Sequence, residues 1–296
     1  MGARRKPPAA AAPFRITHPE RVVFADPEVT KGELAAFYQR IAAHLLPDLI
    51  GRPVMLMRCP AGGAGECFFQ KHRSPGFPAA VHEVNDTKDR QRWLYIEDLA
   101  GLMGLVQMNA LEFHVWGSTV ANLERADRLV IDLDPGPGVA WKSVIETALA
   151  LRARLQAAKL QSFVRTTGGK GLHVVIPVRP ACDWERARAF SRALAESLVR
   201  EQPTRYLSVA TKAERTGKIF IDYLRNGRGA TAVCSYSLRN RPGAPIATPL
   251  TWEELPRLRG GDQFGYANIE RRLARLPRDP WAGIDTLRQS LPKPKA

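Results

Sequence analysis

Apolar residues recur along this chain with two different periods, which predict an alternation of helices and strands. After a capping box formed by Thr30 and Glu33, apolar side chains repeat at intervals of three and four residues from Leu34 to Leu45. This spacing places them on one face of a helix, so we expect a helix over residues 31–46.

Shorter apolar runs bounded by glycine and proline predict further elements. We expect strands within 51–60 and 66–78, an apolar helix running into a strand over 93–115, a helix over 141–159, and a helix that Asp183 caps and that extends to about residue 200. Residues 161–178 predict two strands joined by a glycine-rich turn. Residues 217–226 predict another strand, which we expect to pair with 230–238 across the sequence NGRG. Because these elements alternate without the regular rhythm of a doubly wound fold, the expected fold class is α+β with mixed sheets.

The expected organisation is one large domain with an extension at each end. With 296 residues and 45% hydrophobic content, the chain is long enough to bury a full core. Residues 1–14 are basic and rich in alanine and proline, which predicts a flexible tail. Residues 277–296 are rich in proline and arginine and predict an extension that lies along the surface or hangs loose. The domain itself is therefore expected over residues 15–276.

The charge of the chain points to a polyanionic partner. Lysine and arginine number 44 against 29 aspartate and glutamate, a formal net charge of +15. Such an excess is typical of proteins that bind nucleic acid. An anionic membrane surface is the alternative, but the sequence contains no long apolar segment or basic amphipathic anchor, so we expect no membrane partner.

The four cysteines match no recognised redox or metal motif. None of them makes a C-x-x-C pair, which favours reduced thiols in a cytoplasmic protein, associated with the nucleoid if its partner is DNA. Cys59, Cys67 and His72 are an alternative zinc site, but their spacing fits no standard zinc pattern. We therefore favour free thiols.

An acidic pair stands at the end of an apolar run in the sequence RLVIDLDPGPGVAW, residues 128–141. The run from Leu129 to Leu133 is short, β-branched and followed by turn residues, which predicts a buried strand. Side chains alternate across a strand, so Asp132 and Asp134 point to the same face, about 6.6 Å apart along the chain. Two carboxylates this close repel each other unless a divalent metal ion or fixed arginine and lysine partners lie between them.

Two further segments supply what phosphoryl transfer on a polyphosphate needs: carboxylates for divalent ions, and cations and backbone amides for phosphates. In TTGGKGLH, residues 166–173, the glycines let a phosphate approach the backbone, while Thr167, Lys170 and His173 offer polar contacts. The spacing is not that of a Walker loop. Asp222 is a third carboxylate on a later predicted strand, and the cations around it in the sequence are Arg215, Lys218, Arg225, Arg228 and Arg239.

Each of these features alone is more often structural than functional. Acidic strand ends, glycine-rich turns and arginine runs are common on protein surfaces. Their conjunction in one basic chain favours a site that processes nucleotides.

Several segments, in the same order along the chain, resemble the polymerase domain of bacterial DNA ligase D. They are VIDLDPGPGV, TTGGKGLHVVIPV and GKIFIDYLRNGRGATAVCSYSLRNRPGAPIATPL, with ITHPERVVF, TKGELAAFY, GRPVMLMRCP and FFQKHRSP nearer the N-terminus. The resemblance covers roughly residues 15–260. That domain belongs to the archaeo-eukaryotic primase superfamily and works in nonhomologous end joining. The resemblance therefore implies a primase-like catalytic core with mixed or antiparallel sheets flanked by helices.

The resemblance also implies roles for individual residues. Asp132, Asp134 and Asp222 fall on the family's metal-binding carboxylates, where two divalent ions, manganese favoured over magnesium, support transfer of a nucleotide from a nucleoside triphosphate to a primer 3′-OH. Thr167 stands where the family usually has serine, which keeps the hydroxyl and adds a methyl group. The positions that match nucleotide-binding or basic positions around the active site are His114, Thr167, Lys170, His173, Arg215, Lys218, Arg225 and Arg239.

Near the N-terminus the resemblance implies contacts with the 5′-phosphate of a gapped or broken DNA end. Arg21 and Lys31 match positions where the family presents lysines to this phosphate, and Lys71 matches a third basic position nearby. Arginine at position 21 keeps the charge and is able to bind the phosphate in a bidentate manner. Phe68 and Phe69 are candidates for stacking on template bases, with core packing the alternative for at least one of them.

The expected function is a repair polymerase that adds ribo- or deoxynucleotides at gaps and double-strand break ends, and the resemblance implies a preference for ribonucleotides. A non-catalytic module that binds DNA ends and a de novo primase are the alternatives. The expected protein partners are Ku and an ATP-dependent DNA ligase in trans. Since 296 residues leave no room for the ligase and phosphoesterase of a full ligase D, we expect either an excised domain or a stand-alone polymerase.

Overall fold

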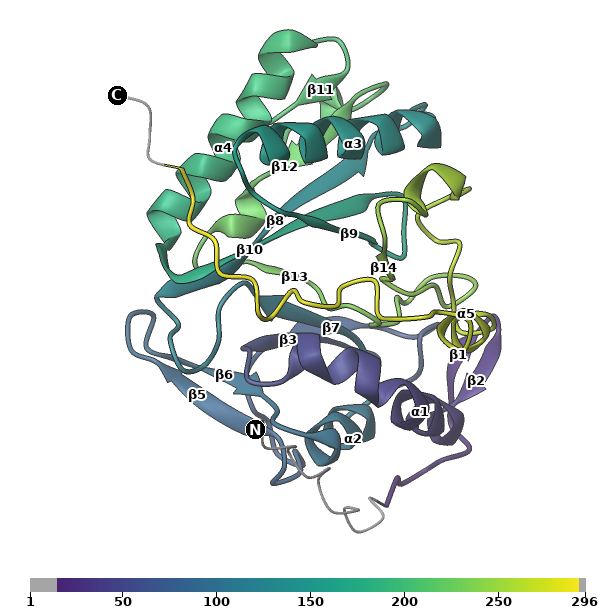
Figure 1. The fold of residues 1–296 in the computed structure, drawn as a ribbon. Helices are drawn as coiled ribbons and strands as arrows, with labels where there is room; N and C mark the ends of the chain where they lie inside the picture. The colour runs from purple at the N-terminus through teal and green to yellow at the C-terminus, as the bar shows by residue number, and fades with distance from the viewer. Residues whose placement is uncertain (1–14, 293–296) are drawn as a thin grey trace.

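The structure, a computed structural model, describes residues 15–292. Two six-stranded sheets lie one above the other, and helices cover the outer face of each sheet (Figure 1). The predicted tail over residues 1–14 and the last four residues of the predicted C-terminal extension lie outside the described range.

The first sheet carries the acidic strand and the glycine-rich hairpin at its centre. Its order is β11 (Tyr206–Leu207), β12 (Ile219–Asp222), β8 (Arg125–Pro135), β10 (Leu172–Asp183), β9 (Phe163–Thr166) and β14 (Pro249–Leu250). Neighbouring strands are antiparallel except for β11 and β12. The predicted acidic strand and the predicted pair of strands over 161–178 are confirmed. The sheet's outer face is covered by α3 (Trp141–Ala157) and α4 (Trp184–Glu201), which confirm two predicted helices (Figure 1).

The second sheet is antiparallel throughout. Its order is β13 (Thr231–Val233), β7 (Ala110–Trp116), β3 (Val54–Arg58), β6 (Gln91–Tyr95) and β5 (His82–Asp86), and β4 (Phe68–Gln70) also pairs with β3. Its outer face is covered by α1 (Lys31–Leu49) and α2 (Leu99–Gln107) (Figure 1). The β5–β6 hairpin was not predicted, because the β5 sequence HEVND has little of the alternation between apolar and polar residues that marks a strand.

Helix α1 begins at the predicted residue and ends later than the local sequence predicts. Thr30 accepts a hydrogen bond from the Glu33 amide at 3.2 Å, and the Glu33 carboxylate accepts one from the Thr30 amide at 2.8 Å, so the predicted capping box is present. The helix continues to Leu49, three residues beyond the predicted end, and buries Asp48 and Leu49. Pro47 lies in its last turn.

Smaller elements complete the chain. The hairpin of β1 (Val22–Ala25) and β2 (Glu28–Thr30) precedes α1. The remaining helical elements are three 3₁₀ turns, η1 (Lys212–Glu214), η2 (Leu224–Asn226) and η3 (Leu255–Arg257), and the short helix α5 (Ile269–Leu273).

The C-terminal strap, residues 277–292, crosses the molecule between the two sheets (Figure 1). Its Trp281 and Ile284 join Val130 and Val175 of the first sheet and Ala232 of the second sheet in one apolar cluster. The Trp281 indole also donates a hydrogen bond to the Val164 carbonyl at 3.0 Å. The predicted extension is therefore partly buried, and it helps to join the sheets.

The expected pairing of residues 217–226 with 230–238 is wrong. Strand β13 pairs with β7 of the second sheet, whereas β12 pairs with β8 and β11 of the first. The amide side chain of Asn226 bonds to both the backbone N–H and the carbonyl of Val130, each at 2.7 Å. It thereby takes the place of a backbone partner beside β8, and the chain leaves the first sheet there.

The expectation of reduced thiols is also wrong for two of the four cysteines. Cys59 and Cys67 form a disulfide across the loop between β3 and β4, which removes both from the alternative zinc site. Cys182 and Cys234 are free and buried. No helix within residues 15–292 has the length and hydropathy needed to cross a bilayer.

Candidate active site

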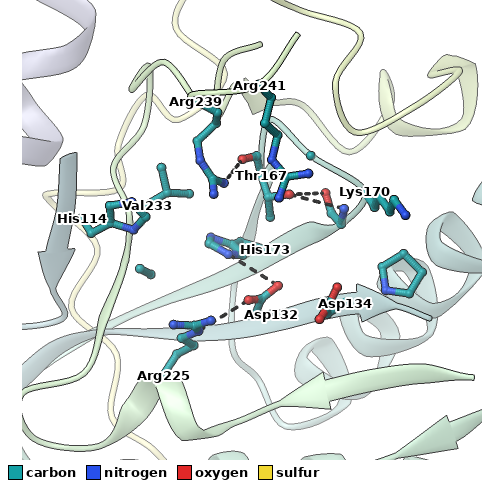
Figure 2. Close-up of a pocket in the computed structure, with 14 residues that line it drawn as sticks. His114, Asp132, Asp134, Thr167, Lys170, His173, Arg225, Val233, Arg239 and Arg241 are labelled. Carbon is teal, nitrogen blue, oxygen red and sulfur yellow. Dashed lines mark hydrogen bonds and ion pairs between the residues drawn. The ribbon is translucent and has the colours of Figure 1, made fainter. Parts of the chain in front are cut away.

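A cavity of about 400 Å³ opens beside β8 and is lined from both sheets. Figure 2 shows its polar side chains, with the ring of His173 and the guanidinium group of Arg225 both directed at Asp132. Eight residues predicted from the sequence line it: His114, Asp132, Asp134, Thr167, Lys170, His173, Arg225 and Arg239. The sequence therefore located one real cavity from segments more than a hundred residues apart.

The three predicted carboxylates are brought together by strand register. Asp222 of β12 is paired directly with Asp132 of β8, and Asp134 lies two residues further along β8 on the same face. The side chains of Asp132 and Asp222 are nearly buried, whereas that of Asp134 is 47% exposed. Asp222 faces an adjoining groove rather than the 400 Å³ cavity.

Arginine side chains pair with these carboxylates. Arg225 Nε lies 3.2 Å from an Asp222 oxygen and 3.5 Å from an Asp132 oxygen, so it bridges the two strands. Arg215 donates to Asp134 at 2.7 Å and packs over the ring of Phe220. Two of the predicted cations thus partly neutralise the acidic cluster.

Despite these contacts, burial and the repulsion between the carboxylates still disfavour their charges. Burial, followed by the charge of Asp132, raises the pKa of Asp134 above its ordinary value. The pKa of Asp222 is raised as well, by burial against the opposing charge of Arg225 and with the repulsion of Asp132 added. Burial also disfavours the charge of Asp132, but its neighbours His173, Arg225 and Arg239 lower its pKa overall.

This donor set suits a divalent cation, because hard carboxylate oxygens that repel one another are stabilised by one. Asp132, Asp134 and Asp222 are the residues that would hold it. Within the described part of the chain, however, no three histidine, cysteine, aspartate or glutamate side chains converge closely enough to surround an ion. The arginine contacts of Asp134 and Asp222 are therefore what a bound cation would have to replace or share.

The glycine-rich turn between β9 and β10 forms one wall of the cavity. The Thr167 hydroxyl lies 3.2 Å from the Gly171 carbonyl and 3.3 Å from the Gly171 amide, so it closes the turn on itself. Gly168 has a φ of 67°, which favours glycine. Lys170 at the tip is exposed. The turn is rigid at Thr167 and presents a cation at Lys170.

A buried acid that was not predicted from the sequence organises the opposite wall. Glu112 on β7 contacts His114 Nε2 at 2.8 Å, accepts a hydrogen bond from Arg239 Nε at 2.8 Å, and accepts another from the Asn240 amide at 2.8 Å. Burial alone would raise the pKa of Glu112, but the His114 hydrogen bond and the Arg239 charge lower it to about 2. The only signal in the sequence was an acid inside the apolar run ALEFHVW.

Arg239 and Arg241 extend the cationic side of the cavity (Figure 2). Arg239 also donates to the Thr167 carbonyl at 2.7 Å, which links Glu112 of the second sheet to the glycine-rich turn. Arg241 lines the cavity beside Gly169 and was not predicted, although its position two residues after Arg239 was a usable signal. Lys218 does not line the cavity, and its carbonyl accepts a hydrogen bond from the Gly136 amide at 2.9 Å.

The residues predicted to contact a DNA 5′-phosphate are in two places. Arg21 and Lys31 are neighbours at the start of α1, where the Lys31 amide donates to the Arg21 carbonyl at 2.7 Å. Lys31 is only 2% exposed, and its ammonium group donates to the Gln107 carbonyl at 2.8 Å. Burial, with the charge of Arg21, lowers the pKa of Lys31.

Lys71 lies 4.7 Å over the ring of Trp93 and faces the groove that Asp222 and Arg225 also line.

Phe68 and Phe69 are exposed at 45% and 53%, so neither is a core residue. Phe69 lines the groove with Lys71 and Asp222, and its ring meets the ring of His114 edge to face at 5.6 Å. This groove has a volume of about 570 Å³ and adjoins the cavity at Arg225. Exposed aromatic rings beside cations are typical of surfaces on which nucleobases stack.

The chain is similar to a known protein family. Residues 30–281 match the family described as LigD, primase-polymerase domain. The solved polymerase domain from Mycobacterium tuberculosis ligase D in complex with DNA superimposes with a TM-score of 0.84 at 30% sequence identity, covering 94% of this chain and 99% of that one. The predicted α+β, primase-like fold is therefore confirmed.

Longer relatives show the same similarity. The multifunctional non-homologous end joining protein LigD of Pseudomonas aeruginosa is 40% identical over 286 residues, which are 96% of this chain and 34% of the relative. That of Mycolicibacterium smegmatis is 34% identical, with coverages of 83% and 33%. The bifunctional protein of Bacillus subtilis is 30% identical, with coverages of 82% and 39%. The chain thus spans about a third of the length of these relatives, and it belongs to the LigD primase-polymerase domain family.

Proposed function

We propose that this chain is a nucleotidyltransferase that adds ribo- or deoxynucleotides to a primer 3′-OH at DNA gaps and double-strand break ends. The observation that carries the proposal is the pairing of Asp132 with Asp222 across β8 and β12, beside a cavity walled by cations. Carboxylates next to a cationic cavity are what phosphoryl transfer requires. The relatives' names place them in non-homologous end joining, and we propose the same pathway here.

The cofactors we propose are two divalent ions, manganese favoured and magnesium possible in its place, with Asp132, Asp134 and Asp222 as their protein ligands. When bound, such ions lower the pKa of the attacking hydroxyl and stabilise the charge of the leaving pyrophosphate. The repulsion of Asp132 against both Asp134 and Asp222 supports this assignment, because positive charge relieves it.

The chain's own residues would bind and orient the nucleoside triphosphate. Lys170, Arg239 and Arg241 present positive charge from the two walls of the cavity, and His173 presents a ring nitrogen between them and Asp132 (Figure 2). Glu112 keeps Arg239 and His114 in fixed positions, so little side-chain entropy is lost when the phosphates bind.

The DNA would lie along the groove that joins the cavity at Arg225. Phe69 offers a stacking surface there, and Lys71 a charge next to Asp222. Arg21 and Lys31 would receive a downstream 5′-phosphate at the start of α1. For this role, the buried Lys31 ammonium group would have to break its hydrogen bond to the Gln107 carbonyl or share it with the phosphate. Ku and an ATP-dependent ligase, in the same or a separate polypeptide, would complete the repair.

Primer extension on a gapped duplex with a downstream 5′-phosphate, with manganese and either ribo- or deoxynucleoside triphosphates, tests the proposal. Asp132→Asn should bind the duplex normally and extend about a thousandfold more slowly or not at all, since it removes a carboxylate but keeps the size of the side chain. Asp183→Asn is the matched control, because Asp183 caps α4 away from the cavity and asparagine caps equally well.

The extension results distinguish a polymerase from a DNA-end-binding module. Extension by the wild type and by Asp183→Asn, but not by Asp132→Asn, supports the polymerase. If the wild type binds the duplex in a gel-shift assay and never extends it, the chain is a DNA-end-binding module. Full extension by Asp132→Asn would overturn the assignment of the carboxylates.

A further inference from the structure

A cluster of buried charges lies directly behind the active-site cavity. Asp48, near the end of α1, contacts both Arg128 of β8 and Arg165 of β9, and all three are buried. Asp48 also accepts a hydrogen bond from the Ser235 amide at 2.8 Å. Since the arginines belong to the first sheet and α1 packs on the second, this cluster joins the two halves of the molecule.

Arg165 uses two separate nitrogens in this cluster. Its terminal nitrogen donates to Asp48 at 2.9 Å and to the Ser235 hydroxyl at 3.0 Å. Its Nε donates to Nδ1 of His173 at 3.2 Å. Arg165 and His173 are directly paired across β9 and β10, and Trp281 of the C-terminal strap covers the guanidinium group at 5.5 Å. The arginine is therefore held on every side, and its Nε cannot turn away from the imidazole.

This contact determines which nitrogen of His173 carries the proton. A guanidinium group has only donors, so the imidazole nitrogen that it meets must be an acceptor. A neutral imidazole with Nδ1 as acceptor carries its proton on Nε2. Nε2 is the nitrogen that lies 3.6 Å from Asp132 and faces the cavity.

We propose that Arg165 is a positioning residue that holds His173 in the Nε2–H form, so that His173 always presents a donor to the cavity. Asp48 and Trp281 fix the arginine, the arginine fixes the imidazole, and the imidazole then has a donor ready for a phosphate oxygen or the Asp132 carboxylate. This role rests on the proposed nucleotidyl transfer for its consequence in activity, but the tautomer itself is a property of the protein alone.

The alternative is that Arg165 only neutralises Asp48 and that its contact with His173 has no effect on the imidazole. Lysine at position 165 separates the two roles. A lysine keeps the positive charge and places one nitrogen near Asp48, but it has no second nitrogen to replace Nε. Arg128→Lys is the matched control, because Arg128 also contacts Asp48 and is equally buried but has no contact with His173.

The first experiment is ¹⁵N NMR of the histidine side chains in the protein without metal or nucleotide, with His173→Gln used to assign the signal. We expect the wild type and Arg128→Lys to show the Nε2–H form of His173, and Arg165→Lys to show a mixture of both forms. A wild-type spectrum with the proton on Nδ1 overturns the proposal even if Arg165→Lys does not fold. An unchanged tautomer in a folded Arg165→Lys also overturns it.

The second experiment is a double-mutant cycle in primer extension. Arg165→Lys should lower kcat/KM for the nucleoside triphosphate by about tenfold or more, a typical effect of removing the partner that orients an active-site imidazole. In a His173→Ala background the same change should cause no additional loss. Equal losses in both backgrounds would show that Arg165 acts through the general fold instead. A wild type with the Nε2–H form but no extension would refute the proposed function and leave the tautomer assignment standing.

Discussion

Asp132 and Asp222 lie directly opposite each other on the antiparallel strands β8 and β12, and a single arginine, Arg225, contacts both carboxylates. Residues paired in this way project from the same face of a sheet with their side chains in reach of each other. Two acids at such a position disfavour folding unless a cation joins them. Arg225 offsets this only in part, because burial keeps the pKa of Asp222 raised, so the metal-free fold carries an unfavourable charge here.

Asp222→Asn should make the metal-free protein more stable while abolishing extension. Burial, together with Asp132, raises the pKa of Asp222, so its charge is unfavourable in the fold at neutral pH. Asparagine removes that charge but keeps the oxygen that accepts a hydrogen bond from the Leu224 amide at 2.8 Å. We expect a gain of about 1 kcal/mol in the free energy of unfolding in urea. A loss of stability would show that the pairing with Arg225 outweighs the repulsion.

Stabilisation by manganese should increase with pH. The pKa values of Asp134 and Asp222 are raised above 3.8, so the folded protein holds these protons more tightly than the unfolded chain does. Their contribution to stability therefore falls as the pH rises from 3.8 through the raised pKa values. Manganese binds the charged carboxylates, so its effect on the melting temperature should be smaller at about pH 4.5 than at about pH 7. An equal shift at both pH values would contradict this assignment.

Glu112→Gln should destabilise the protein and weaken nucleotide binding together. The folded-state pKa of Glu112 is about 2, below its ordinary 4.5, so its charge stabilises the fold above pH 4.5 and this contribution is lost as the pH falls toward 2. Removing the charge leaves Arg239 without its buried partner, at a cost of about 3 kcal/mol at neutral pH.

Urea unfolding of both proteins at about pH 7 and about pH 3 checks the size and the pH dependence of the Glu112 effect, because the difference should narrow at the lower pH. Glu253→Gln is the control, since Glu253 is 76% exposed and lies outside the active-site cavity. The Glu112 prediction fails if the two variants behave alike.

Gly171→Ala should displace the glycine-rich turn. A Cβ atom at this position would lie 2.3 Å from the Leu133 carbonyl, between Asp132 and Asp134, and backbone cannot move aside as a side chain can. We expect a loss of about 2 kcal/mol in stability and of most nucleotide affinity. Gly227→Ala is the control, because its φ is −88° and its nearest neighbour is 3.4 Å away. Normal nucleotide binding by Gly171→Ala, measured by fluorescence titration, would show that the turn adapts.

Much of the fold could be predicted from the sequence, because it depends on local interactions. The capping box of α1, the Asp183 cap of α4 and the hairpin β9–β10 depend on residues within a few positions of each other, so the sequence alone was enough to predict them. The same holds for Asp132 and Asp134, because alternation along β8 places them on one face whatever surrounds the strand.

Features that join distant segments could not be predicted from the sequence. β13 pairs with β7 and not with β12, and no local pattern records which strand edge is still free. Glu112 is a single acid in an apolar run, and Arg165 directly precedes two threonines, so neither stands out in the local sequence. Their roles depend on partners 2 to 128 positions away for Glu112, and 8 to 117 for Arg165.

By itself, then, the sequence determined the four longer helices, the β9–β10 hairpin, the acidic face of β8 and the family, because these depend on periodicity, caps and motifs within short segments. Only the tertiary structure decided that Asp222 faces Asp132, that Cys59 and Cys67 are joined, and that Asp48 holds Arg165 behind His173. The physical reason is that a buried charge is stable only beside its partner. Which residue becomes that partner is settled when the two sheets pack together.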